Sequence, residues 1–384
     1  MGIQDLYKVI PKNQCIAYRL QEFEGMRFAV DISIFLYKTI RSCGPDRWKS
    51  YFMLLLCTLK KNHIRAVCIF DGPNPPPEKA REQKRRRDEN KKHLSRLSEA
   101  IEMRNLLQDS YLVSDDMPSD DIIRKCKNVI DPRKKKSDFT IYSNVSDIIE
   151  SLKSVIQKLE YQTIPITNEH KEMAKSIVEM MGLHMIQADG EAEGLCASLA
   201  VSGYVDAVLT EDTDVLAYKT PLMIAFKKYK ISDEMVIGIH FESLLEEMDL
   251  SSDEFRDLCI LLSCDYNDRV KGYPPDGKTH KKPISIGAKH ALTMIEEYRT
   301  LEIIEDHLED ANPLIYPRCR ELFTPPPIDA TMMIPYNLEP DYIKLAKFME
   351  EYRVNIDINY IKDCYTHERI EFDENTVSNS NEEN

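Results

Sequence analysis

Long apolar runs and C-x-x-C pairs are both missing from this 384-residue chain. Every apolar run is shorter than the roughly 18 residues that span a bilayer, and no secretory signal opens the chain, so we expect a soluble protein without membrane contact. Met1-Gly2 begins like a myristoylation site, but Leu6 stands where serine or threonine is needed. The ten cysteines form no zinc or redox motif, and several lie inside apolar runs, so we expect reduced core residues and an intracellular protein.

The chain also has fewer basic residues than acidic residues. The chain has 51 Lys and Arg against 65 Asp and Glu, a formal net charge of -14. This balance is unusual for a protein that binds nucleic acid, so any attraction to phosphate must come from local patches and bound metal. The length suggests about two or three domain-sized units with room for a large core.

Acidic residues stand where apolar runs end. Residues 27–30, 65–70 and 204–210 are short apolar runs rich in Val and Ile, which predict strands of a parallel sheet covered by helices on both faces. Ligands of such sheets bind beyond the carboxyl ends of the strands. A single aspartate there is more often a turn former or a helix cap, but the recurrence predicts one shared site. The acids concerned are Asp31, Asp71, Glu191, Glu193, Asp212, Asp214 and Asp265.

Two acid-x-acid pairs indicate the chemistry of this site. If Asp212 and Asp214 continue the extended geometry of the strand, both side chains lie on one face. Glu191 and Glu193 stand at the expected start of a helix, where the helix dipole favours anions. Carboxylates this close repel one another unless a cation lies between them, and oxygen ligands suit Mg²⁺ or Mn²⁺ rather than zinc. The alternative is a solvated acidic loop.

The positive charge is concentrated between residues 79 and 104, which hold ten basic residues against five acids. Leu94, Leu97 and Ile101 at helical spacing predict an amphipathic helix. Because this helix leaves the sheet soon after Asp71, its basic side chains would lean over the predicted metal site and could hold a phosphate. The alternatives are a nuclear-localisation run or a merely solvated helix.

A different unit follows the sheet. Ser251 and Glu254 have the spacing of a capping box, and the helix behind them carries apolar residues at helical spacing and ends near Asp265. A second helix is expected to open at residues 285–289, after Gly272 and a polar, proline-containing loop. Two helices joined by glycine turns form a phosphate cradle that reads no base sequence. The alternative is an ordinary helical hairpin.

These residues resemble the flap endonuclease/XPG family of structure-specific 5' nucleases, from residue 1 to about residue 350. The resemblance is carried by Met1-Gly2-Ile3-Gln4, Ala29-Val30-Asp31, Phe70-Asp71-Gly72, Glu191-Ala192-Glu193, Thr210-Glu211-Asp212-Thr213-Asp214, the run from Leu258 to Tyr266, and Ile286-Gly287-Ala288-Lys289. It implies an α/β fold with a mostly parallel central sheet flanked by helices, a PIN-like nuclease core, together with a helical arch and a helix-two-turn-helix DNA-binding unit.

The resemblance also implies a role for each acid. Two Mg²⁺ ions, or Mn²⁺, would be held, one mainly by Asp31, Asp71, Glu191 and Glu193 and the other mainly by Asp212, Asp214 and Asp265. These ions would activate the attacking water and stabilise the departing oxygen, leaving a 5'-phosphate and a 3'-hydroxyl. Lys79 and Arg86 match the pair that grips the scissile phosphate, and they complete the implied catalytic set.

Contacts to DNA follow from the same resemblance. Tyr37 matches an aromatic residue that stacks on a base beside the cut, although it could be only a core aromatic. A K⁺ ion is implied at the helix-two-turn-helix. The residues implied to contact DNA are Gly2, Tyr37, Lys79, Arg86, Glu191, Ser263, Asp265, Gly272, Gly287 and Lys289.

The chain departs from the family pattern at four places. Asp71 and Glu191 are 120 positions apart (191 - 71), a longer spacer than in compact flap endonucleases, and residues 273–283 are an insertion in the helix-two-turn-helix. Ser263 replaces a common glycine. The acidic tail lacks the motif that docks on a sliding clamp, so we expect no clamp binding through it and a disordered end.

The expected organisation has six parts. The nuclease core comprises residues 1–78 and 166–250, interrupted by the arch at 79–165, through which a single-stranded 5' end would pass. Residues 251–300 are expected to form the DNA-binding unit. Residues 301–365 are expected to form a helical region packed on the core, and residues 366–384 are the acidic tail. We expect a monomer.

The favoured function is a metal-dependent 5' nuclease on flapped or branched DNA, in replication, repair or recombination. The alternatives are a 5'-to-3' exonuclease or four-way-junction resolvase on the same scaffold, and an inactive DNA-binding scaffold. A preference for RNA would indicate the related exoribonucleases. The expected location is nuclear in a eukaryote, and otherwise the cytoplasm or a viral replication site.

Overall fold

The computed structural model describes residues 2–113, 120–130, 145–275 and 282–366. Within them, seven strands form one sheet, and five consecutive strands of it, β6, β5, β2, β3 and β4, are parallel to one another. The strand β7 pairs antiparallel with β6 on one side and with β1 on the other. In spatial order the strands are β1 (Ile16–Arg19), β7 (Met235–His240), β6 (Leu222–Ala225), β5 (Ala207–Leu209), β2 (Arg27–Asp31), β3 (Arg65–Phe70) and β4 (His184–Gln187).

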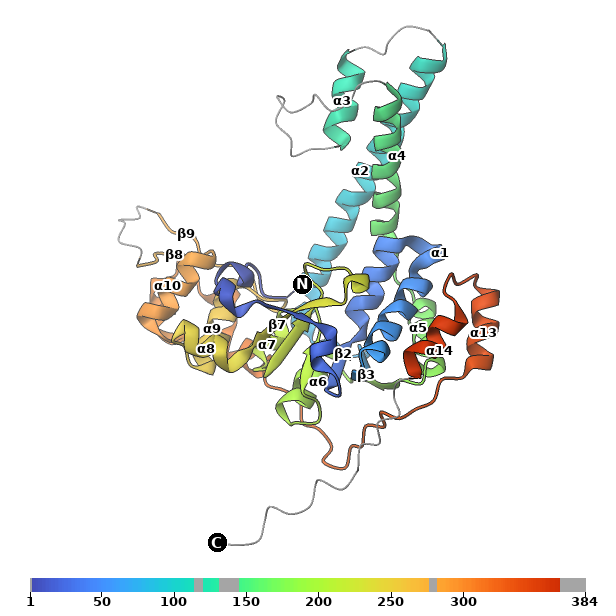
Figure 1. The fold of residues 1–384 in the computed structure, drawn as a ribbon. Coiled ribbons are helices and arrows are strands. Elements are labelled where there is room, and N and C mark those ends of the chain that lie inside the picture. Colours follow the sequence, from blue (N-terminus) through green and yellow to red (C-terminus); the bar gives the residue numbers. More distant parts are fainter. Residues whose placement is uncertain (1, 114–119, 131–144, 276–281, 367–384) are drawn as a thin grey trace.

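Helices cover both faces of this sheet (Figure 1). On one side, α1 (Ile32–Lys61) and α5 (Asn168–Met180) share an apolar cluster with the sheet, and α13 (Tyr342–Glu351) and α14 (Ile358–Tyr365) join it through contacts with these two helices. On the other side, α6 (Ala192–Val201), α7 (Asp214–Ala217), α8 (Phe241–Met248) and α9 (Ser252–Leu262) share a second apolar cluster with the sheet. This cluster extends through α9 to α10 (Ala288–Tyr298), α11 (Leu301–Ile304) and α12 (Tyr316–Leu322). Short 3-10 turns are η1 (Leu6–Lys8), η2 (Lys12–Gln14), η3 (Leu20–Phe23), η4 (Pro77–Lys79), η6 (Ile231–Asp233), η7 (Glu305–His307) and η8 (Asn312–Leu314).

Alternation along the strands explains the two layers. In β2, Phe28 and Val30 enter one apolar cluster and Ala29 the other, because successive side chains point to opposite faces. All three are fully buried. The predicted α/β fold with a mostly parallel, helix-covered sheet is therefore confirmed. The predicted strand at 204–210 is shorter than expected, since β5 begins only at Ala207.

A helical projection rises from the core (Figure 1). It consists of α2 (Ala80–Val113), α3 (Asp120–Ile130) and α4 (Val145–Thr163), which share their own apolar cluster. The helix predicted from residue 79 is present, and Leu97 and Ile101 pack into that cluster. Leu94 is 48% exposed, so its predicted place on the apolar stripe is wrong.

The base of α4 rests on a break in α1. Gly44 has a φ of 76°, inside the range of α1, and a Cβ there would lie 2.4 Å from the ring of Tyr161 on α4. Only glycine leaves room for this close approach of the two helices.

The unit after the sheet differs from the prediction at its turn. The capping box of α9 is present, with Glu254 N–H donating to the Ser251 hydroxyl at 3.2 Å. The second helix, α10, begins at Ala288 with Gly287 as its N-cap, inside the predicted range 285–289, but β8 (Lys271–Gly272) and β9 (Ile284–Ser285) form a hairpin before it. The tip of this insertion, and the tail from residue 367, lie outside the described residues. No helix in the described ranges combines the length and apolar character that a membrane span needs.

Candidate active site

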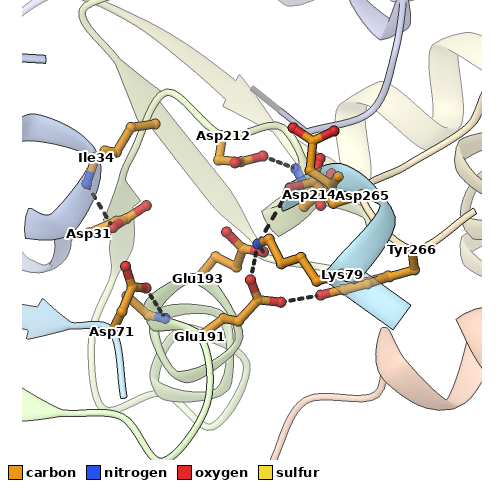
Figure 2. A network of polar contacts seen from close by, with 12 residues as sticks. Asp31, Ile34, Asp71, Lys79, Glu191, Glu193, Asp212, Asp214, Asp265 and Tyr266 are labelled. Atoms are coloured by element: carbon orange, nitrogen blue, oxygen red, sulfur yellow. Dashed lines mark hydrogen bonds and ion pairs between the residues drawn. The ribbon is translucent and has the colours of Figure 1, made fainter. Parts of the chain in front are cut away.

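The order of the strands brings three of the acids together. Asp31 is the last residue of β2, Asp71 directly follows β3, and Asp212 lies three residues beyond β5. Because β5, β2 and β3 are neighbouring parallel strands, their carboxyl ends meet at one edge. Figure 2 shows these side chains facing the same region as Glu191 and Glu193.

Two loops interlock to bring Asp71 to the start of α6. Gly72 N–H donates to the Gly190 carbonyl at 2.6 Å, and a Cβ on Gly72 would lie 2.1 Å from the carbonyl oxygens of residues 188 and 189. The Asp71 carboxylate accepts a hydrogen bond from Ala192 N–H, 3.0 Å away, in the first turn of α6. Glu191 caps this helix, as its predicted position at a helix start requires.

Asp212 and Asp214 do not continue the strand, so the extended geometry considered for them is wrong. The chain turns after β5, Asp214 opens α7, and its N–H donates to Asp212 Oδ1 at 3.1 Å. Gly2 packs against this turn with a φ of 83°, and a Cβ on it would lie 2.1 Å from Asp212 Oδ1. Gly2 therefore contributes by close approach to the acids.

A lysine lies in the middle of the acids. The Lys79 ammonium forms an ion pair with Glu191 and lies 3.7 Å from Glu193 and 3.4 Å from Asp265, as Figure 2 shows. Arg86, two turns further along, donates to Asp265 Oδ2 at 3.0 Å. The structure thus brings the predicted cationic pair and the predicted acids into one cluster.

Two residues that donate to the acids, and a third that contacts one of them, received no role from the sequence. Tyr266 donates to Glu191 Oε2 at 2.8 Å, and its hydroxyl lies 3.2 Å from that of Tyr218. The Thr210 hydroxyl donates to Asp31 at 3.0 Å and accepts from the backbone of Asp212. Thr210 and Tyr266 lie inside the motifs that carry the resemblance, whereas nothing in the sequence marks Tyr218.

Burial dominates the electrostatics of the site. It raises the pKa of Asp31 to about 7, with the charges of Asp71 and Asp212 adding to the effect. It also raises the pKa of Glu193 and of Asp214 well above the ordinary range, where neighbouring carboxylates act in the same direction. For Lys79, burial lowers the pKa, but the surrounding carboxylates outweigh it and the net change is an increase. The cluster therefore holds one ammonium among several carboxylates that resist ionisation.

The donor set fits hard divalent cations. Within the described residues, Glu193 Oε1, Asp212 Oδ2 and both carboxyl oxygens of Asp214 are buried without a hydrogen-bond partner. Carboxylate oxygens are the ligands that Mg²⁺ and Mn²⁺ prefer. Within the described ranges, no group of three or more Asp, Glu, His or Cys side chains has the arrangement needed to hold a single metal ion. Lys79 lies between the carboxylates instead.

The raised pKa values predict how stability depends on pH. The folded, metal-free protein keeps protons on Asp31 and its neighbours that the unfolded chain loses above about pH 4, so the unfolding free energy falls as pH rises toward 7. We expect a loss on the order of 3 kcal/mol between pH 5 and 7.5, measured by thermal or urea unfolding in EDTA. Asp31→Asn should make the profile less steep, while the protons held by Glu193 and Asp214 keep part of the slope. A stability that increases over this interval would contradict the prediction.

Three further residues predicted to contact DNA, Tyr37, Ser263 and Gly272, are half-buried or buried. Tyr37 is half-buried on α1, with the Arg41 guanidinium 5.9 Å from its ring centre. Ser263 is buried at a φ of 78°, which explains why glycine is common there, and its hydroxyl donates to the Asn267 carbonyl at 3.0 Å. Gly272 packs against the backbone of His307.

The turn before α10 is more open. Gly287 is the N-cap of α10, and a Cβ there would meet nothing within 4 Å. Lys289 is exposed in the first turn of the same helix. This helix start is therefore accessible, as a phosphate cradle requires.

A mostly parallel sheet with buried acids at its carboxyl edge, beneath a basic helix, defines an α/β nuclease core. Residues 1–93 match the XPG N-terminal domain and residues 182–265 the XPG I-region. The chain therefore carries the N-terminal domain and the I-region of the XPG family of nucleases, and its sequence is similar to flap endonuclease 1 over most of its length.

Individual relatives agree with this assignment. Flap endonuclease 1 of Nematostella vectensis is 28% identical over 351 residues, covering 85% of this chain and 76% of that protein. The catalytic core of Rad2 in complex with a DNA substrate has a similar fold, with a TM-score of 0.60 and 18% identity, over 94% of this chain and 98% of that one. Human GEN1 in complex with Holliday junction DNA gives a TM-score of 0.53 at 18% identity, over 94% of this chain and 76% of that one.

Proposed function

We propose that the protein is a metal-dependent, structure-specific 5' nuclease that hydrolyses phosphodiester bonds in flapped or branched DNA. The observation that carries the proposal is the cluster of buried carboxylates around Lys79, with Arg86 beside it, at the base of the basic helix α2. Flap DNA is the first substrate to test, because the chain is similar to flap endonuclease 1.

The acids would hold two divalent ions, one among Asp31, Asp71, Glu191 and Glu193 and the other among Asp212, Asp214 and Asp265. Bound ions supply the positive charge that activates a water and stabilises the departing oxygen. The low exposure of these side chains keeps bulk water away from the reacting groups, which strengthens every charge interaction there.

Lys79 and Arg86 would bind the scissile phosphate. Arg86 presents a planar group of N–H donors, only two of which are used by Glu82 and Asp265 in the described structure. Lys79 adds a point charge deeper in the cluster. Lys79 directly precedes α2 and Arg86 lies in its second turn, so a phosphate held there would lie directly over the acids.

A second grip on duplex DNA is proposed at the start of α10. Gly287 leaves the first amides of the helix accessible and Lys289 adds a positive charge beside them. Such a helix end binds backbone phosphate without reading bases. The K⁺ ion expected at this turn stays a prediction.

Cleavage mapping tests the proposal. A 5'-labelled flap, a blunt duplex with a recessed end and a four-way junction are incubated with the protein in Mg²⁺ and, separately, in EDTA. We expect a cut at the base of the flap that leaves a 5'-phosphate and a 3'-hydroxyl, and no product in EDTA. Cleavage that persists unchanged in EDTA would contradict the role of the acids.

The same panel separates the alternatives. Release of mononucleotides from the blunt duplex would identify a 5'-to-3' exonuclease, and paired cuts in the junction a resolvase. Binding without cleavage of any substrate in Mg²⁺ or Mn²⁺ would support the inactive scaffold.

A further inference from the structure

Glu82 is a buried acid beside the proposed phosphate grip that has no part in the function described so far. It is 8% exposed and lies one turn after Lys79 and one turn before Arg86 on α2. Asp88 and Glu89, further along the same helix, are not buried. An ionised carboxylate in this position requires partners that compensate the loss of hydration.

Two arginines provide that compensation. Glu82 Oε1 accepts hydrogen bonds of 2.6 Å from Arg86 Nε and from Arg85 Nη2, and Oε2 accepts one of 2.5 Å from Arg85 Nε. Burial acts to raise the pKa of Glu82, but these hydrogen bonds and charges outweigh it, so the pKa is lowered and the carboxylate stays ionised.

These contacts fix the direction of the Arg86 side chain. Its Nε donates to Glu82 and its Nη2 donates to Asp265, so the planar guanidinium is held at two points between α2 and the acid cluster. A free arginine side chain of this length has several rotamers, and ordering it costs up to about 2 kcal/mol. Glu82 therefore prepares Arg86 before a substrate arrives.

Asp265 cannot be the lasting anchor of Arg86. It is one of the predicted metal ligands, and its Oδ2 already lies 3.4 Å from Lys79 as well as 3.0 Å from Arg86. A cation bound at Asp265 would compete for the same oxygen. Glu82 would then be the remaining carboxylate that holds Arg86 within the described contacts.

An ordinary helix ion pair is the competing explanation. Glu82 is three and four residues before its partners, and exposed pairs at that spacing contribute about 0.3–0.5 kcal/mol. Glu89 with Arg85 is such a pair, 51% and 54% exposed, at 2.6 Å. The side chain of Glu82 is only 7% exposed, and its partner Arg86 reaches Asp265.

We propose that Glu82 is a positioning residue that orients the Arg86 guanidinium toward the scissile phosphate. This inference rests on the proposed nuclease function. Because Glu82 is itself negative, its removal would by charge alone tighten the binding of DNA. A loss of turnover with unchanged or tighter DNA binding is therefore specific to positioning.

A double-mutant cycle on flap DNA tests this role. We compare the wild type, Glu82→Ala, Arg86→Ala and the double variant, measuring kcat in Mg²⁺ and the Kd for flap DNA in EDTA. We expect Glu82→Ala to lower kcat about 10-fold with a Kd unchanged or lower, and Arg86→Ala to lower it about 100-fold. The double variant should be no slower than Arg86→Ala, because both changes remove one interaction.

Two further variants serve as controls. Glu82→Gln keeps an oxygen that accepts from Arg86 Nε and should retain kcat within about threefold of the wild type. Glu89→Ala removes the exposed pair and should leave kcat unchanged. Thermal unfolding gives the folded fraction of each variant, and kcat is normalised to this fraction. Glu82→Gln keeps the test valid if the alanine variant folds poorly.

The outcomes separate this inference from the function on which it rests. If the wild type cleaves the flap but Glu82→Ala keeps its kcat within twofold, or if the two losses multiply in the double variant, the positioning role is wrong. If the wild type cleaves no DNA substrate, the proposed function itself is wrong.

Discussion

Asp214→Asn is expected to abolish cleavage and, at the same time, to stabilise the metal-free protein. Asp214 is fully buried, neither of its carboxyl oxygens has a hydrogen-bond partner in the described structure, and its pKa is raised well above the usual range by burial and by Asp212 and Asp265. An uncharged amide of the same shape removes that repulsion, so the unfolding free energy should rise by about 1 kcal/mol or more. The loss of a proposed metal ligand should lower kcat about 1000-fold.

The two effects are measured separately. Cleavage of flap DNA is followed in Mg²⁺, and unfolding by urea is followed in EDTA at pH 7.5. Asp268→Asn is the matched control, because Asp268 lies close to the site but is exposed, 3.0 Å from Arg81. It should change the unfolding free energy by less than about 0.5 kcal/mol. A destabilised or fully active Asp214→Asn would mean that the carboxylate has a different role.

Lys79→Met should produce the largest loss of stability. The ammonium is buried, forms an ion pair with Glu191 and lies within 4 Å of Glu193 and Asp265. Removing one partner from a buried charge cluster costs about 3–5 kcal/mol, because the other charges stay buried and unpaired. Methionine keeps the length of the side chain, so packing changes little. Loss of the phosphate contact should also lower kcat about 100-fold.

Metal addition distinguishes the charge effect from a packing effect. If the carboxylates bind divalent ions, Mg²⁺ should raise the unfolding free energy of Lys79→Met by more than it raises that of the wild type. Urea unfolding with and without Mg²⁺ measures both quantities. Lys84→Met removes an exposed charge from the same helix and should leave the unfolding free energy within about 0.5 kcal/mol of the wild type. Equal stability of Lys79→Met and the wild type in EDTA would contradict the proposed charge balance.

Several features of the fold could be read from residue patterns because they depend on local physics. Continuous burial along residues 28–31 and 66–70 requires apolar side chains on both faces of the sheet, and the capping box at Ser251 and Glu254 is a contact within one turn. The same holds for Glu191 at the start of α6. The start of β5 was predicted too early, because pairing partners decide where a strand begins. The hairpin of β8 and β9 around the insertion at 273–283 was not foreseen.

The sequence alone predicted which residues would carry the chemistry: seven acids, Lys79 and Arg86, in motifs that resemble those of the family. Their arrangement required the tertiary structure. Strand order places β5, β2 and β3 side by side, and the start of α2 inserts Lys79 among carboxylates that are up to 186 positions away (265 - 79). Spacing along the chain carries no information about such contacts, nor about Tyr218 or Glu82, because burial and electrostatic energy depend on distances in space.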